Sequence, residues 1–94
     1  MKPDKNSPWL PVKYELADVT AIQALNRGEA NADQQKRAMK WIIELASRLY
    51  EFNYYPSERD TSFALGRVFV GQQIVKMLKL NVSNLRRNEN EPIP

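Results

Sequence analysis

The chain of 94 residues contains no cysteine and no histidine. Without cysteine it can form neither a disulfide nor a thiolate metal site, which fits a reducing compartment. Without histidine it lacks the most common general base, the most common zinc ligand and the usual pH switch. Its carboxylates form no pattern that marks a catalytic pair. We therefore expect no enzyme activity, no catalytic residue, no metal, no cofactor and no small-molecule substrate.

A long apolar run and a strong net charge are missing as well. No stretch approaches the roughly 18 apolar residues that span a bilayer, and residues 1–9 lack the apolar centre of a signal peptide. Lysine and arginine exceed aspartate and glutamate by only 14 to 11, and this surplus is spread along the chain. A dedicated nucleic-acid-binding protein usually carries more positive charge. We expect a soluble intracellular protein that has no membrane partner.

The N-terminal residues 1–17 hold three of the six prolines, and proline keeps the backbone extended. We therefore expect an extended arm over this range. Trp9 in the arm either packs onto the domain or contacts a neighbouring molecule. A short helix is predicted for residues 18–27, because Asp18 suits its N-cap and Gly28 suits its C-terminal stop.

A second helix is predicted for residues 32–53, where Asn31 caps the start and Gln34 reaches back to it. Its apolar arc is roughly 200° wide, whereas one packing partner covers about 100°. We therefore expect this helix to pack against at least two other elements, in this chain or in another. Ser47 falls on its polar side. The apolar arc consists of Ala38, Met39, Trp41, Ile42, Ile43, Leu45, Ala46, Leu49, Tyr50 and Phe52.

A turn that ends at Pro56 precedes a third predicted helix at residues 58–80, which Ser57 caps. The two long helices are expected to form an antiparallel hairpin. Together with the short helix they make an all-α domain of two to three helices over residues 18–80. Residues 81–94 are mostly polar and are predicted to form a mobile tail.

Two glycines, Gly66 and Gly71, lie inside the third helix. An interior glycine costs a helix about 1 kcal/mol relative to alanine, and the close approach of another backbone is the usual reason for it. We predict helix packing at both positions. A phosphate-binding loop is excluded, because no strand precedes this segment and no Lys-Ser/Thr ending follows it. Arg67 projects into the apolar stripe. There it pairs with Asp60 or Glu44, or extends its aliphatic stem along the stripe to solvent, or contacts an acidic partner or a phosphate.

The main apolar stripe of the third helix consists of Phe63, Val70, Ile74, Met77 and Leu78. Leu65 and Phe69 lie one turn apart on the opposite side, beside Gln72 and Lys76. Either the short helix or the arm covers this apolar pair, or the pair contacts another molecule. The candidate partner-binding residues are therefore Trp9, Trp41, Leu65, Arg67, Phe69, Gln72 and Lys76.

Aromatic residues crowd the turn between the long helices, and Arg48 and Arg59 flank them. They either close the core or stack on single-stranded nucleic acid. These residues are Tyr50, Phe52, Tyr54 and Tyr55. DNA reading by the third helix is not favoured, because Glu58 and Asp60 at its start repel phosphates.

Between Gly28 and Leu80 the chain contains several short motifs, each once: a glycine before a small or acidic stretch, a Gln-Gln pair before a Trp-Ile helix, an acidic start of the next helix, and Phe-Ala-x-Gly-Arg-x-x-Val-Gly. They stand here at Gly28, Gln34-Gln35, Trp41-Ile42, Asp60 and residues 63–71. In these motifs the chain resembles a family of small uncharacterised proteins of tailed bacteriophages, typically encoded among the head and DNA-packaging genes. The family often has a second basic residue after Arg67, where this chain has Val68, which counts against a phosphate role. The resemblance implies a phage origin and a virion or packaging role.

We therefore expect a non-enzymatic module that acts by protein–protein contact in virion assembly or DNA packaging, in the host cytoplasm or the virion. Its partner would be a second copy, another phage protein or a host protein. An alternative is a phage-encoded inhibitor that binds a host enzyme or defence complex. A second alternative is a nucleic-acid-binding accessory protein that uses the basic residues Arg37, Lys40, Arg48, Lys76 and Lys79.

Overall fold

The structure is a computed structural model that describes residues 7–87 of the chain. Every regular element within this range is a helix, so the predicted all-α fold is confirmed. Four α-helices and one π-helical segment follow each other, namely α1 Leu16–Asn26, α2 Ala32–Lys40, η1 Trp41–Ala46, α3 Glu58–Lys79 and α4 Val82–Arg87. None of these described helices is both long and apolar enough to cross a lipid bilayer.

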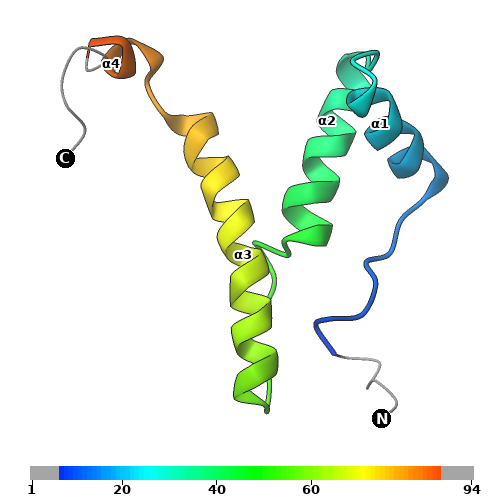
Figure 1. The fold of residues 1–94 in the computed structure, drawn as a ribbon, viewed down its shortest axis with the longest axis vertical. Helices are drawn as coiled ribbons and strands as arrows, with labels where there is room; N and C mark the ends of the chain where they lie inside the picture. Colours follow the sequence, from blue (N-terminus) through cyan, green and yellow to red (C-terminus); the bar gives the residue numbers. More distant parts are fainter. Residues whose placement is uncertain (1–6, 88–94) are drawn as a thin grey trace.

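α2 and η1 form one continuous rod that lies between α1 and α3 (Figure 1). α1 packs along α2, and α3 packs against η1. The prediction that this rod packs against at least two other elements is therefore confirmed within the chain. α3 runs antiparallel to the rod, as predicted, but the two diverge from their contact toward the α4 end of the molecule (Figure 1).

Capping residues define both ends of α1, and each cap is formed by residues that are near neighbours in the sequence. Glu15 is its N-cap, and Asp18 is the third helical residue that reaches back to it, so the prediction of Asp18 as the cap is wrong. At the other end Gly28 has a φ of 72°. The N–H of Gly28 donates to Leu25 O at 3.1 Å, and the N–H of Glu29 donates to Ala24 O at 2.9 Å. This pair of bonds is a Schellman motif, which ends the helix as predicted.

The rod starts as predicted but ends earlier. Asn31 and Gln34 cap each other's backbone N–H groups at 2.8 and 3.0 Å. From Trp41 the helix widens to π geometry, and the rod ends at Ala46 rather than at residue 53. Arg48 then adopts a left-handed conformation with φ 54°. Glycine usually occupies the left-handed position at the end of a helix. Because arginine stands there in this chain, the sequence contains no recognisable signal for the end of the rod.

The core of the described chain consists of small side chains. Besides Pro8 and Gly71, the buried apolar residues are four alanines, one isoleucine and one valine, namely Ala21, Ala24, Ala38, Ala64, Ile43 and Val68. No large side chain is fully buried between residues 7 and 86, whereas large apolar and aromatic residues are exposed on every helix and on the turn before α3. Burial of apolar surface is the main favourable term in folding, so this chain gains less from it than a typical domain.

Both predicted ends of the domain need correction. The predicted arm at residues 1–17 extends too far, because Leu16 already belongs to α1. The predicted mobile tail at residues 81–94 is wrong over residues 82–87, which form α4. Asn81 caps this helix, since its Oδ1 accepts the N–H of Ser83 at 2.9 Å. Residues 1–6 and 88–94 lie outside the described residues.

Candidate functional site

A close contact joins Ser47, the residue directly after the rod, to the middle of α3. Ser47 Oγ donates to the Arg67 carbonyl at 2.8 Å and accepts the N–H of Gly71 at 3.1 Å. These two backbone groups belong to residues four apart, so the hydroxyl lies directly against the hydrogen-bond ladder of α3. A Cβ at position 71 would lie 2.9 Å from Ser47 Cβ. The predicted packing role of Gly71 is therefore confirmed. Nothing lies within 4 Å of a Cβ at Gly66, so that half of the prediction is wrong for this chain's own helices.

The side chain of Arg67 is held by hydrogen bonds within the chain. Its guanidinium donates to the Pro8 carbonyl. It also donates to Asn53 Oδ1 at 3.3 Å and to the Tyr55 hydroxyl at 3.2 Å. Among the described residues no carboxylate lies within ion-pair distance of it, so the predicted pairing with Asp60 or Glu44 is wrong. Because both terminal nitrogens have acceptors within the chain, a role for Arg67 in contacting an acidic partner loses its basis.

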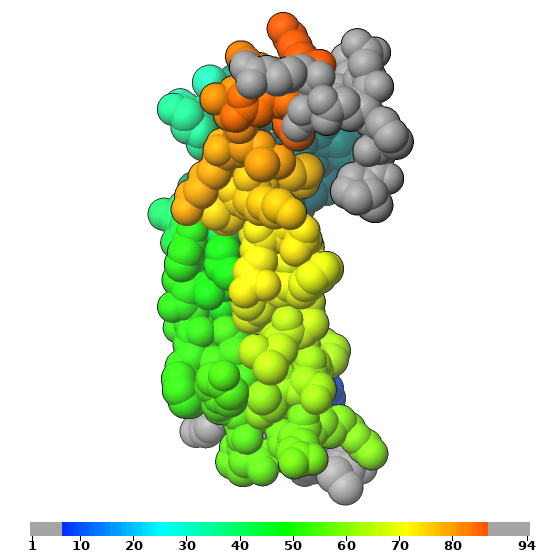
Figure 2. Space-filling model, turned by 90° about the vertical axis from the view of Figure 1, so that its left-hand side faces the viewer, coloured from blue at the N-terminus to red at the C-terminus, as the bar shows by residue number. Residues whose placement is uncertain are grey.

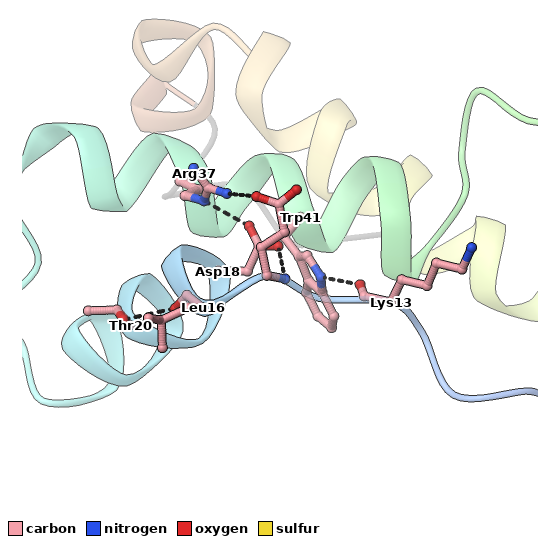
Figure 3. A network of polar contacts seen from close by, with 7 residues as sticks. Lys13, Leu16, Asp18, Thr20, Arg37 and Trp41 are labelled. Carbon is pink, nitrogen blue, oxygen red and sulfur yellow. Dashed lines mark hydrogen bonds and ion pairs between the residues drawn. The ribbon is translucent and has the colours of Figure 1, made fainter.

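A polar network fastens α1 to α2 (Figure 3). Arg37 Nε donates to Asp18 Oδ1 at 2.8 Å, and its terminal nitrogen donates to Glu15 Oε2 at 3.0 Å. The backbone N–H of Glu15, and then the Arg37 guanidinium, hold the pKa of Asp18 below its ordinary value, although burial acts in the opposite direction. The Trp41 indole N–H donates to the Lys13 carbonyl at 3.1 Å, so this predicted partner-binding residue is already used within the chain.

The outer side of α3 stays open to solvent. Leu65 is 44% exposed and Phe69 is 59% exposed, so neither α1 nor residues 7–15 cover this pair. Gln72 and Lys76, one and two turns further along, are also exposed. Figure 2 looks at the side of the molecule on which α3 lies uncovered, with α4 above it. We call Leu65, Phe69, Gln72 and Lys76 the α3 face, and it unites four of the seven predicted partner-binding residues.

The other three predicted residues lie elsewhere. Trp41 and Arg67 are half-buried in the networks described above, and Trp9, in the segment before α1, is 49% exposed. The main apolar stripe predicted for α3 is exposed as well, at Phe63, Val70 and Met77, which follow each other at seven-residue intervals. Because these residues are exposed to a similar degree on the same helix, they serve as a matched control for the α3 face.

The turn before α3 exposes its aromatic rings. Tyr50, Phe52 and Tyr54 are exposed, and the rings of Phe52 and Tyr54 lie 5.5 Å apart at an angle of 53°. The expectation that the aromatic residues of this turn close the core is therefore wrong for these three. Only Tyr55 is half-buried, where its hydroxyl meets the Arg67 guanidinium.

A cavity of about 530 Å³ lies between residues 7–13 and the end of the rod. Its charged lining mixes Lys13, Arg48 and Arg67 with Glu44 and Glu51. Such a mixture favours neither a phosphate nor a cation. Within the part of the chain that the structure describes, no group of three or more acidic residues is placed to hold a metal ion.

Two buried polar residues that hold this arrangement together escaped the sequence analysis. Ser47 is 3% exposed and Asn53 is 6% exposed. Asn53 Nδ2 donates to the carbonyls of Arg48 and Glu51 at 3.0 and 2.7 Å, while its Oδ1 accepts from Arg67. Ser47 was hidden by its position, because a helical wheel at 100° per residue puts it on the polar side. The π-helical turn shifts the register, so Ser47 takes the inward place that the wheel gives to Ala46.

Comparison of the chain with protein-family models, with curated proteins and with solved structures gives no match in any of the three.

Proposed function

We propose that this chain is a non-enzymatic protein–protein interaction module and that the α3 face is its contact surface. The observation that carries the proposal is the distribution of side-chain size. Small residues fill the core, while Leu65 and Phe69 stand roughly half exposed on the longest helix. Covering the exposed parts of these two side chains would contribute about 1 kcal/mol each.

The composition of the α3 face is that of an interface centre and its rim. A leucine and a phenylalanine one helical turn apart form a compact apolar patch. Exposed Gln72 and Lys76 lie beside it, and polar residues typically surround the apolar centre of an interface. A partner helix or loop can therefore cover the apolar pair while the amide and the ammonium stay hydrated.

We propose virion assembly or DNA packaging as the setting, in the host cytoplasm or the virion. Support comes from the resemblance to phage proteins, whose Phe-Ala-x-Gly-Arg-x-x-Val-Gly pattern covers residues 63–71 of this chain. That pattern includes Gly71, which contacts Ser47 just after the rod, whereas Leu65 and Phe69 stand at positions that it leaves open. An inhibitor of a host enzyme would use the same surface, so the identity of the partner separates the two settings.

The alternative of nucleic-acid binding receives less support from the contacts. Arg37, one of the basic residues proposed for it, pairs with Asp18 and Glu15. Arg48 lies 3.9 Å from Glu51. These carboxylates compete with phosphates for the two guanidinium groups, which leaves the lysines as the main free cations of the proposed set.

The proposal is tested by capture of the partner with a tagged chain from phage-infected cells and identification by mass spectrometry. Three baits are compared: the wild type, the double variant Leu65→Lys with Phe69→Lys, and the control Val70→Lys with Met77→Lys. Both variants add two charges to exposed positions of α3. Circular dichroism confirms that each bait is folded.

A protein that the wild type and the control retain and the Leu65/Phe69 variant loses is the expected result. A packaging or head protein would support the assembly setting, and a host enzyme would support the inhibitor. If the Leu65/Phe69 variant retains every protein that the wild type captures, the α3 face is ordinary surface and the proposal fails.

A further inference from the structure

The residues that line the outer side of α3 follow a heptad pattern. Starting from Glu58, intervals of four, three, four, three and four residues lead along one side of the helix. Positions with this spacing lie within a narrow arc of an α-helix. All six residues are exposed, and they comprise Glu58, Ser62, Leu65, Phe69, Gln72 and Lys76. We call this row the α3 seam, and it contains the α3 face.

Two copies of the α3 seam that run in opposite directions place chemically complementary side chains opposite each other. Consider two antiparallel copies of the helix centred on position 67. A residue of one copy then faces the residue of the other copy for which the two residue numbers add up to 134. Leu65 then faces Phe69 of the second copy, which makes an apolar pair. Glu58 faces Lys76 of the second copy, which makes an ion pair, and Ser62 faces Gln72, a polar pair. Each pair occurs twice around the two-fold axis, as an isologous interface requires.

Charge selects the antiparallel arrangement over the parallel one. Parallel helices in register would set Glu58 against Glu58 and Lys76 against Lys76, and like charges across an interface are unfavourable. Neither residue has an ion-pair partner within the described chain, so both are free to pair with another molecule. Antiparallel pairing also opposes the two helix dipoles, which places the acidic start of each α3 beside the basic end of the other.

We infer that the α3 seam binds a second copy of this chain, with the two α3 helices antiparallel and centred on position 67. The inference rests on the proposed function and names its partner. α3 has 22 residues and is therefore about 33 Å long, so the contact is at the lower end of specific interfaces. We expect a dissociation constant of roughly 1–100 µM.

Cysteine cross-linking tests the register directly, because the chain has no cysteine of its own. An equimolar mixture of Leu65→Cys and Phe69→Cys chains is expected to form a disulfide-linked dimer under mild oxidation. A mixture of Glu58→Cys and Lys76→Cys chains should do the same. Glu58→Cys alone should not, because the two copies of position 58 lie about 27 Å apart in the antiparallel dimer and a disulfide needs Cα atoms within about 7 Å. Ala17→Cys, on α1, measures random collision.

Charge reversal tests the ion pairs by sedimentation equilibrium. Glu58→Lys and Lys76→Glu are each expected to raise the dissociation constant roughly 10-fold, because two attractions per dimer become repulsions. The two substitutions together should restore it to within about 3-fold of the wild type. Arg59→Glu, an exposed position outside the α3 seam, should change it less than about 2-fold.

The outcomes separate this inference from the proposed function. A chain that stays monomeric at about 500 µM, or one that cross-links through Glu58→Cys alone, overturns the inference. If such a monomer still captures a partner that the Leu65→Lys and Phe69→Lys variant loses, the α3 face binds a different protein and the proposed function stands. If the chain is monomeric and captures no such partner, both fail.

Discussion

Substitution of Gly71 by alanine should destabilise this protein although alanine is the better helix former. In an exposed helix interior the change would stabilise by about 1 kcal/mol. At position 71 the added methyl group would lie 2.9 Å from Ser47 Cβ and 3.3 Å from Leu49 Cβ, so the rod and α3 must move apart. Such overpacking typically costs 1–3 kcal/mol. Loss of the two Ser47 hydrogen bonds adds about 1 kcal/mol each.

The net effect is a loss of about 3 kcal/mol, from about 2 for overpacking and about 2 for the hydrogen bonds, less about 1 for helix propensity. For a chain of this size that loss lowers the melting temperature by roughly 12–24 °C. Thermal unfolding followed by circular dichroism measures it, in dilute solution so that self-association does not contribute.

Gly66→Ala is the matched control, since nothing lies within 4 Å of a Cβ there. It should raise the melting temperature by roughly 4–8 °C. In a double-mutant cycle, Ser47→Ala should cost less in the Gly71→Ala background than in the wild type, because the hydrogen bonds of Ser47 are already broken. Equal stabilisation by Gly66→Ala and Gly71→Ala would refute the crossing contact between Ser47 and α3.

Three further predictions concern stability. Arg67→Met should lower the free energy of unfolding, measured in urea, by about 2 kcal/mol, because the acceptors in the turn and in the N-terminal segment lose their donor. An unchanged free energy of unfolding would contradict this role of Arg67. The pKa of Asp18 lies below its ordinary value of 3.8, so its stabilising contribution is complete above that pH and is lost as the pH falls further. Asp18→Asn should therefore lower stability near pH 7 and flatten its dependence on acid, and an unchanged acid slope would contradict the ion pair. Arg48→Gly should stabilise by up to about 1 kcal/mol, because it relieves the left-handed backbone, whereas destabilisation would show that the arginine side chain outweighs the strain.

Helix ends that depend on only a few neighbouring residues could be predicted from the sequence. The mutual cap of Asn31 and Gln34 and the glycine stop at position 28 depend only on neighbouring residues, and the structure contains both. Asn81 belongs to the same class, since an asparagine cap begins α4. The polar composition of the C-terminal residues concealed that cap and led to the wrong prediction of a tail there.

The position at which the rod ends could not be predicted in the same way. A π-helical turn has no sequence signature comparable to a cap, and it moves every later residue to a new side of the helix. As a result Ser47 was assigned outward, although it is buried against α3. The common side of Leu65, Phe69, Gln72 and Lys76 could be predicted, because they lie on one uninterrupted helix where 3.6-residue periodicity holds, whereas their role in binding stays a prediction.

The central claim is that another protein covers the outer side of α3 when the chain is in use. The most direct measurement is the rate at which a maleimide labels Ser62→Cys, a near-isosteric change on the α3 seam, in cells that contain the chain with its partners and in the dilute purified chain. We expect labelling at least about 10-fold slower in the cells, because a protected fraction of about 90% corresponds to a nearly saturated site. Each rate is taken relative to that of Ala17→Cys on α1 in the same setting, because glutathione in cells consumes maleimide and slows the labelling of every cysteine. Equal relative rates for Ser62→Cys in the two settings would contradict the claim.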